Sequence, residues 1–216
     1  MPGSYPVPPA LAIPDYWLKA KRALARRDPV MDAILRAHPR IGLRSRGDPF
    51  QTLVRAIIGQ QISVKAADTV WNRVHAAVGE VRPARFLETS LDRLAACGVS
   101  QRKAEYLRDL AHRFEHDLLH PGLWPAMEDE AIIEELVRVR GIGRWTAEMF
   151  LMFNLLRPDV LPVDDQGLLR AVGLHYFQGE RVGAAEVRVV AEVWRPWRSV
   201  ATWYLWRSLE PVPVEY

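Results

Sequence analysis

The stretch from Val137 to Gln166 reads VRVRGIGRWTAEMFLMFNLLRPDVLPVDDQ, and the expected fold is built around it. Residues Asp129–Val139 mix polar and apolar side chains at helical spacing, and a second apolar helix is predicted from about Arg144 to Leu155. Only Gly141-Ile142-Gly143 separates the two patterns. Because glycine backbones fit a tight bend, the stretch predicts a hairpin of two helices.

The second helix of this hairpin begins with backbone N–H groups that have no partner within the helix, and such a terminus attracts anions. Arg144 and Thr146 lie beside these amides, next to Gly141 and Gly143. Nothing in the turn reads a base, so the expected ligand is a nucleic-acid phosphate bound without sequence preference. From the glycines alone, a plain helical hairpin with a glycine C-cap is an equal interpretation.

Composition permits a nucleic-acid partner without requiring one, since the net charge is +3 and the pI is near 9.2. The single cysteine, Cys97, excludes a disulfide within the chain and suits a reducing compartment. No signal peptide is evident, and the apolar runs are too short to span a membrane. We therefore expect an intracellular, cytoplasmic protein with no membrane partner.

Helical patterns recur along the chain, at about Asp15–Arg27, at Pro29–Ala37 and, after Ser63 as a cap, at Val64–Val78. No convincing strand pattern is present, so the fold class is predicted to be all-α. Residues 1–13 are proline-rich and are expected to form a flexible lead-in to a core that spans residues 14–216.

About twenty residues after Gly143, the segment Leu161-Pro-Val-Asp-Asp-Gln-Gly opens another amphipathic helix. With the hairpin, it resembles the helix-hairpin-helix DNA glycosylases, and most of all the alkylated-base branch of the 3-methyladenine DNA glycosylase II type. That branch shares Gly-Ile-Gly-Arg-Trp-Thr-Ala and the Pro-x-Asp-Asp turn. The match extends upstream to Arg55–Val64 and downstream to Pro196–Ser199, so four motifs cover most of residues 45–210.

The resemblance implies a two-lobed helical core without an N-terminal β-domain. One lobe is expected from about residues 14–58 plus 160–216. The other is expected from about residues 59–159, with the hairpin at 137–146. The implied partner is duplex DNA containing a damaged base, bound by a monomer.

Hydrolysis of an N-glycosidic bond passes through an oxocarbenium-like sugar and needs an anion near C1′ and a water within reach. Asp165 matches the catalytic aspartate of the family, and Asp164 would support it. On the residues alone, one of the two is merely an N-cap. Where strand-nicking relatives carry a nucleophilic lysine, this chain has Trp145. The resemblance therefore implies a monofunctional enzyme that leaves an abasic site.

The implied base pocket contains Trp145, Trp206 and Met149, where Met149 replaces an aromatic residue of some relatives. Aromatic walls suit cationic alkylated purines such as 3-methyladenine. The target base must first be flipped out of the stack.

The loop containing Gln60 and Gln61 either caps neighbouring backbone or, as in the family, faces DNA. In the second case Gln61 fills the gap left by the extruded nucleotide.

Relatives hold a monovalent cation in the hairpin, which here implies Na⁺ or K⁺ on the main-chain carbonyls of Val137, Val139 and Ile142. No cofactor is required, and one cysteine excludes the four-cysteine iron–sulfur cluster of some relatives. Two interpretations apply to the helix start at Arg102 and Lys103, namely contact with the phosphate backbone and a solvated face, and the solvated face is favoured.

Two other functions stay open. One is a non-catalytic helix-hairpin-helix module that binds DNA or scaffolds repair proteins. The other is a glycosylase for uncharged lesions such as hypoxanthine.

Overall fold

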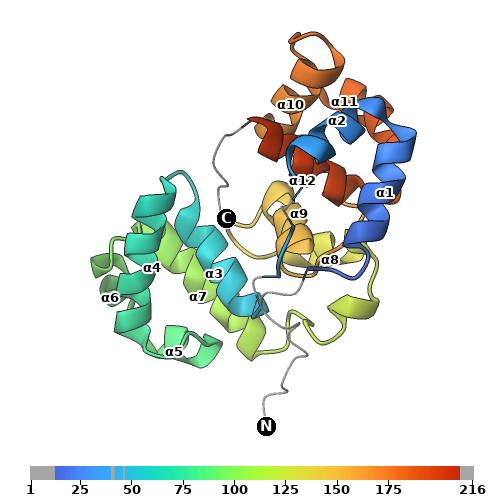
Figure 1. Cartoon of the computed structure of the whole chain (residues 1–216). Helices are drawn as coiled ribbons and strands as arrows, with labels where there is room; N and C mark the ends of the chain where they lie inside the picture. Colours follow the sequence, from blue (N-terminus) through green and yellow to red (C-terminus); the bar gives the residue numbers. More distant parts are fainter. Residues whose placement is uncertain (1–12, 40–41, 46, 210–216) are drawn as a thin grey trace. The chain divides into compact units, whose positions relative to one another are not determined.

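The computed structural model describes residues 13–39, 42–45 and 47–209 (Figure 1). The predicted flexible segment, residues 1–13, lies outside this part of the chain except for Ile13. The elements are α1 (Trp17–Arg27), α2 (Pro29–Ala37), α3 (Pro49–Gly59), α4 (Val64–Val78), α5 (Pro83–Glu88), α6 (Leu91–Ala96), α7 (Gln101–Glu115), α8 (Asp129–Leu136), α9 (Arg144–Phe153), α10 (Gln166–Tyr176), α11 (Ala184–Ala191) and α12 (Arg198–Leu209), with the short 3-10 helices η1 (Trp124–Ala126) and η2 (Glu192–Trp194). No strand occurs among the described residues, so the all-α prediction is confirmed.

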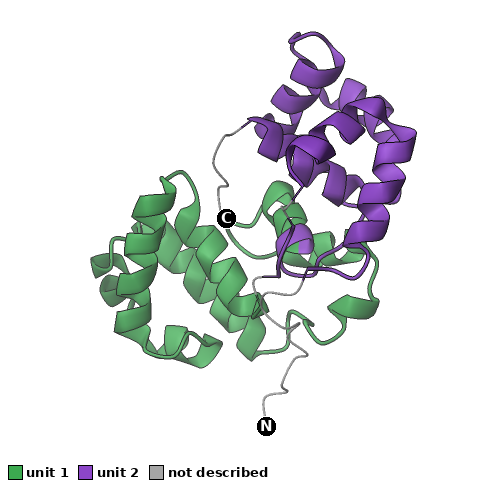
Figure 2. Cartoon of the chain, viewed as in Figure 1, with its two compact units in different colours: residues 1–8, 46–150 green, residues 9–45, 151–216 purple. Residues whose placement is uncertain are grey.

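The chain divides into two compact units (Figure 2). Unit 1 contains residues 1–8 and 46–150, and unit 2 contains residues 9–45 and 151–216. The sequence suggested divisions near residues 58 and 159 instead. The structure assigns α3 to unit 1 because α3 packs against α4 and α7. In the part of the chain that is described, no helix is long and apolar enough to cross a bilayer.

The core of unit 1 contains a row of aromatic rings in edge-to-face contact. Phe50 contacts Phe86 and Phe114, at ring-centroid distances of 5.4 and 5.2 Å. Phe114 leads to Trp124 at 6.2 Å, and Trp124 contacts Phe150 of α9 at 5.1 Å. Such pairs add roughly 0.5–1.5 kcal/mol each beyond area burial. The row therefore anchors the hairpin helix α9 to the helices that precede it.

The core of unit 2 is joined by the buried carboxylate of Asp28, which is 5% exposed. Its Oδ1 caps α2 by accepting the N–H groups of Val30 and Met31. Its Oδ2 accepts the hydroxyl of Tyr176 at 2.6 Å and the indole N–H of Trp194 at 2.9 Å. Burial and the bond to Asp28 raise the pKa of Tyr176, so this phenol stays protonated as a donor. Asp28 therefore ties the start of α2 to the ends of α10 and η2.

Candidate active site and nucleic-acid-binding hairpin

The predicted hairpin is present in unit 1, with α8 ending at Leu136 and α9 beginning at Arg144. Gly141 has a φ of +85°, and a Cβ at this position would collide with the ring of Tyr106. A Cβ at Gly143 would meet nothing within 4 Å. A glycine is therefore required at position 141, both by the left-handed backbone conformation and by the close packing of the Tyr106 ring. The second leaves open space beside the first amides of α9, where an anion can approach.

Arg144 is held inside the hairpin by two carboxylates. Its Nη1 and Nη2 lie 2.6 and 2.8 Å from the carboxylate of Glu130 on α8, and its Nε lies 3.1 Å from buried Glu148. The bond to Glu130 raises the pKa of Arg144 above its ordinary value. Thr146 is 8% exposed. The side chains expected to bind phosphate are therefore ion-paired or buried, and binding of phosphate by the backbone amides stays a prediction.

The three carbonyl positions expected to bind a cation lie in the turn between α8 and α9. Val139 and Ile142 are buried, and the carbonyl of Val139 accepts the N–H of Ile142 at 3.1 Å. A carbonyl oxygen has a second lone pair, so this bond leaves room for a ligand role. Oxygen donors suit Na⁺ or K⁺, and the cation stays a prediction. The described residues contain no cluster of three or more His, Cys, Asp or Glu side chains that could hold a metal ion.

The loop between α3 and α4 is tied to the hairpin by Gln60 and to α7 by Lys103, all within unit 1. Gln60 donates from Nε2 to the carbonyl of Gly141 at 2.8 Å. Lys103 donates from Nζ to the carbonyls of Ile58 and Gln60, at 2.7 and 2.6 Å. Desolvation lowers the pKa of Lys103. The interpretation of Lys103 as part of a solvated face was wrong, because its ammonium group caps the C-terminal end of α3.

Gln61 differs from Gln60 in both backbone and exposure. Its φ is +58°, in the left-handed region, and its side chain is exposed. A non-glycine residue in this region stores conformational strain, which commonly marks functional sites. The capping role that the sequence left open thus belongs to Gln60. Gln61 is the glutamine of this loop that faces solvent, and its wedge role stays a prediction.

In unit 2, Asp165 is the N-cap of α10. Its Oδ1 accepts the N–H of Leu168 at 2.7 Å and the indole N–H of Trp206, also at 2.7 Å. Asp164 is exposed. The residue that caps the helix is therefore the one predicted to be catalytic, and its catalytic role stays a prediction.

Trp206 is half-buried on α12 and stacks on Phe153, with 6.1 Å between ring centroids and 16° between ring planes. Its neighbour Trp203 is only 8% exposed and packs in the core. Gly167 lets the indole lie against α10, because a Cβ there would be 3.0 Å from Cδ1 of Trp206. Neither Phe153 nor Gly167 was predicted. The sequence signal that could have indicated this close contact was Gly167, a glycine in the first turn of the helix that Asp165 caps.

The loop that leads to Asp165 is held by the Pro196–Ser199 motif, which the sequence singled out without a role. Arg198 donates from Nε and Nη2 to both carboxylate oxygens of Asp159, at 2.7 and 2.8 Å. Ser199 accepts the N–H of Val160 at 2.9 Å. Bidentate pairs of this kind fix geometry as well as adding energy. The motif therefore positions the backbone that enters α10.

The remaining predicted pocket residues, Trp145 and Met149, lie on α9. They are four residues apart and therefore share one face of the helix. Trp145 is 44% exposed, whereas Met149 is half-buried. Contact of either side chain with a base stays a prediction.

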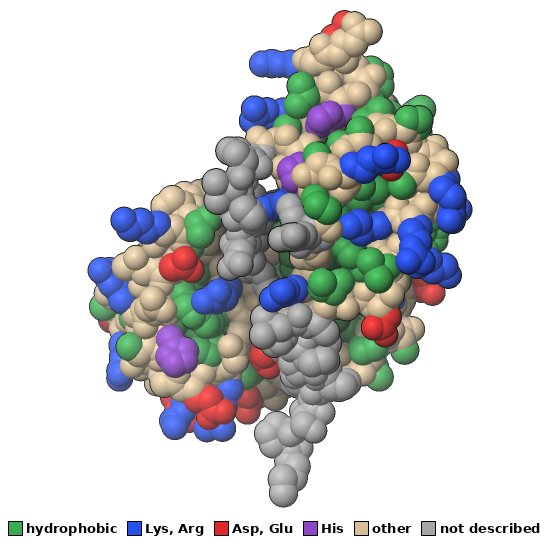
Figure 3. All heavy atoms as spheres, viewed as in Figure 1, with side chains coloured by type: hydrophobic (Ala, Val, Ile, Leu, Met, Phe, Trp, Pro, Cys, Tyr) green, Lys and Arg blue, Asp and Glu red, His purple; other side chains and the backbone are tan. Residues whose placement is uncertain are grey.

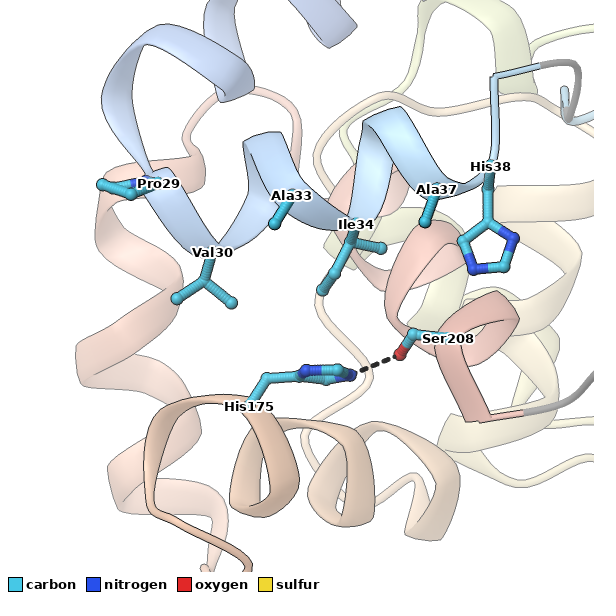
Figure 4. Close-up of a pocket in the computed structure, with 8 residues that line it drawn as sticks. All are labelled: Pro29, Val30, Ala33, Ile34, Ala37, His38, His175 and Ser208. Atoms are coloured by element: carbon cyan, nitrogen blue, oxygen red, sulfur yellow. Dashed lines mark hydrogen bonds between the residues drawn. The ribbon is translucent and has the colours of Figure 1, made fainter.

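A hollow of 540 Å³ lies in unit 2 between α2, α10 and the end of α12 (Figure 4). Its walls include Val30 and Ile34, and His175 and Ser208 form a 2.7 Å hydrogen bond on its floor. His175 is in the last turn of α10, whereas Asp165 caps the first. This hollow is therefore not the predicted base pocket.

Comparisons with known proteins agree with this arrangement. Residues 54–198 match the family described as "HhH-GPD superfamily base excision DNA repair protein". The chain is 33% identical over 172 residues to DNA-3-methyladenine glycosylase 1 of Schizosaccharomyces pombe, covering 74% of this chain and 72% of that protein.

Two solved structures are also similar. The DNA-3-methyladenine glycosidase of Bacillus halodurans has a TM-score of 0.76 and 35% identity, covering 85% of this chain and 90% of that one. The Schizosaccharomyces pombe 3-methyladenine DNA glycosylase Mag1, in complex with abasic DNA, has a TM-score of 0.77 and 29% identity, covering 88% and 96%.

Proposed function

The chain belongs to the HhH-GPD superfamily of base excision DNA repair proteins, and from this premise we propose that it is a monofunctional DNA glycosylase for alkylated purines. Its reaction is hydrolysis of the N-glycosidic bond of bases such as 3-methyladenine in duplex DNA, with an abasic site as product. The relatives named DNA-3-methyladenine glycosylase support this substrate class. The Mag1 complex with abasic DNA supports DNA as the partner. The proposed active form is a monomer.

The observation that carries the proposal is the carboxylate of Asp165. Two N–H donors hold its Oδ1, one from the first turn of α10 and one from Trp206. A preorganised anion of this kind stabilises positive charge that develops on the sugar as the base departs. The C1′–N bond breaks with its electron pair leaving on the base, water attacks C1′ and releases one proton to solvent, and the products are the free base and an abasic sugar. An N-alkylated cationic purine is already a good leaving group, so this mechanism needs no strong general acid.

The monofunctional part of the proposal rests on Trp145. Strand cleavage by a glycosylase requires an amine that attacks C1′ and forms a Schiff base. Trp145 occupies the position after Gly-Ile-Gly-Arg at the start of α9, and an indole cannot act as that nucleophile. The abasic strand is therefore expected to leave the enzyme intact.

Base extrusion is assigned to the α3–α4 loop. The target bond lies inside the base stack, so the base must be flipped out before reaction. Gln61 is exposed on a left-handed backbone and is the proposed filler of the vacated space. Its amide can both occupy volume and hydrogen-bond the orphaned base.

The test is base release from duplex DNA treated with a methylating agent, followed by chromatography of the free bases. Release of 3-methyladenine, with strands that break only after alkali, supports the proposal. A protein that binds the duplex and releases no base would instead be a non-catalytic hairpin module. Release confined to hypoxanthine would move the substrate class to uncharged lesions.

A further inference from the structure

Helix α1 concentrates the positive charge of the chain. Its eleven residues include five basic side chains and no acidic one, namely Lys19, Lys21, Arg22, Arg26 and Arg27. The whole chain has a formal net charge of only +3. The rest of the chain is therefore net negative by two charges, the difference between +3 and +5. Such asymmetry indicates a surface that attracts a polyanion.

Three of these side chains form a row on one face, which we call the α1 basic face: Lys19, Arg22 and Arg26. They are spaced i, i+3 and i+7, and all three are exposed. At 1.5 Å per residue the row is roughly 10 Å long. The opposite face packs into unit 2 through Trp17, Ala20, Ala23 and Leu24. Lysine and arginine side chains gather over α1 at the right of Figure 3.

The charges of the α1 basic face are not neutralised locally. Among the described residues, none of Lys19, Arg22 and Arg26 takes part in an ion pair. By contrast, Arg36 on the adjacent helix α2 is 2.9 Å from Asp32. An arginine already paired with a carboxylate gains little binding free energy from a phosphate. A cationic side chain without such a pair neutralises the phosphate and releases a counterion from the DNA. Arg144 in the hairpin belongs to the first kind, since Glu130 and Glu148 hold it.

An aromatic surface continues the row at its N-terminal end. The ammonium of Lys19 lies 5.9 Å from the ring centroid of Trp197. Tyr16 stacks on the same indole at 5.7 Å. Contact with the Trp197 ring keeps the Lys19 side chain on the α1 basic face, with its ammonium group outside the hydrophobic core.

We propose that the α1 basic face binds the phosphate backbone of duplex DNA as a second contact, in addition to the hairpin amides. The inference rests on the proposed function, because it takes duplex DNA as the partner. A regular row of unmatched cations fits a backbone of evenly spaced phosphates. A lipid surface fits less well, because the apolar face of α1 is buried in unit 2 and Leu18 alone is an exposed large apolar residue on this helix.

The first test is the salt dependence of binding to undamaged duplex, so that it does not depend on base excision. In the triple variant Lys19→Gln/Arg22→Gln/Arg26→Gln, the slope of log K against log salt should fall by about 2–3, and its binding should converge with wild type at high salt. The matched control is Arg36→Gln, which removes an exposed arginine that is already paired and should keep the wild-type slope. A triple variant with the wild-type slope would overturn the proposal. So would loss of binding to anionic phospholipid vesicles with unchanged DNA binding.

The second test is direct cross-linking. Cys97 is buried, so a cysteine introduced by Arg22→Cys can be labelled selectively with a photoreactive group. It should cross-link to duplex DNA, whereas the same label at Arg36→Cys should not. Equal cross-linking at both positions, or at neither, would overturn the contact. If the protein releases no base but shows the slope change and the cross-link, the proposed glycosylase activity is wrong and the proposed DNA contact of the α1 basic face is still supported.

Discussion

The indole Nε1 of Trp206 donates a 2.7 Å hydrogen bond to Oδ1 of Asp165, which lies 41 residues earlier in the chain. The same oxygen also accepts the N–H of Leu168. Two donors converging on one oxygen fix the orientation of the carboxylate. The residue predicted to stabilise the sugar cation and the residue predicted to contact the base are therefore parts of one hydrogen-bonded assembly.

Replacing Asp165 with asparagine tests the charge at this position. Asparagine is a good N-cap, so Asp165→Asn should fold and bind undamaged DNA. Loss of the anion should slow base release by a factor of 10² or more, about 3 kcal/mol, measured in single turnover. The control is Asp164→Asn, which changes an exposed neighbour and should keep the wild-type rate. The opposite pattern would reverse the assignment of the two aspartates.

Substitution of Trp206 tests selectivity. Trp206→Phe keeps a ring but weakens the cation–π face and removes the donor to Asp165. Release of cationic 3-methyladenine should fall more than release of neutral hypoxanthine, by roughly 1 kcal/mol. Trp203→Phe is the matched control, since Trp203 is buried and should affect Tm more than selectivity. Equal losses for both bases in Trp206→Phe would limit its role to positioning Asp165, and the selectivity prediction would fail.

Trp145 predicts the form of the product. Borohydride added during turnover should trap no protein–DNA adduct, because no lysine occupies that position. The products should be free base and an intact strand that breaks on alkali treatment. The measurement is denaturing electrophoresis with and without alkali. A trapped covalent species would contradict the monofunctional assignment.

Lys103 is expected to hold the loop that carries Gln61. Lys103→Met removes two bonds to the carbonyls of Ile58 and Gln60. Bonds from a charged donor contribute about 1.5–3 kcal/mol each, so amide hydrogen exchange over residues 58–62 should become faster. Arg102→Met changes the exposed neighbour and is the control. Unchanged exchange in Lys103→Met would show that the loop is ordered without this clamp.

Asp28 is expected to be a major determinant of stability in unit 2. Asp28→Ala leaves the buried donors of Tyr176 and Trp194 without an acceptor, and it also removes the cap of α2. Each unsatisfied donor costs about 1–3 kcal/mol, so Tm should drop by several degrees. Asp32→Ala breaks only an exposed ion pair on the same helix and should change Tm little. Similar Tm values for the two variants would contradict the role given to Asp28.

Local features of the chain were predictable because short-range chemistry decides them. The spacing of apolar residues placed α2 and α4 at Pro29–Ala37 and Val64–Val78, as observed. The glycines marked the hairpin turn, and an aspartate before an amphipathic run marked the start of α10. The boundaries of the two units were harder to predict from the sequence, because they depend on the packing of α3 against α4 and against α7, which is more than 40 residues away along the chain.

The sequence alone determined several of the longer helices, the hairpin, the cap of α10 and, through its motifs, the family, whereas the short helices α5, α6 and α11 were not predicted. Only the tertiary structure decided which polar groups meet. Glu130 neutralises Arg144 from 14 residues away, Lys103 reaches the end of α3 across 45 residues, and Trp206 reaches Asp165 across 41. The spacing of apolar residues along the chain does not predict such pairs. They form because packed helices bring distant side chains together, and because buried donors and acceptors are costly to leave unpaired.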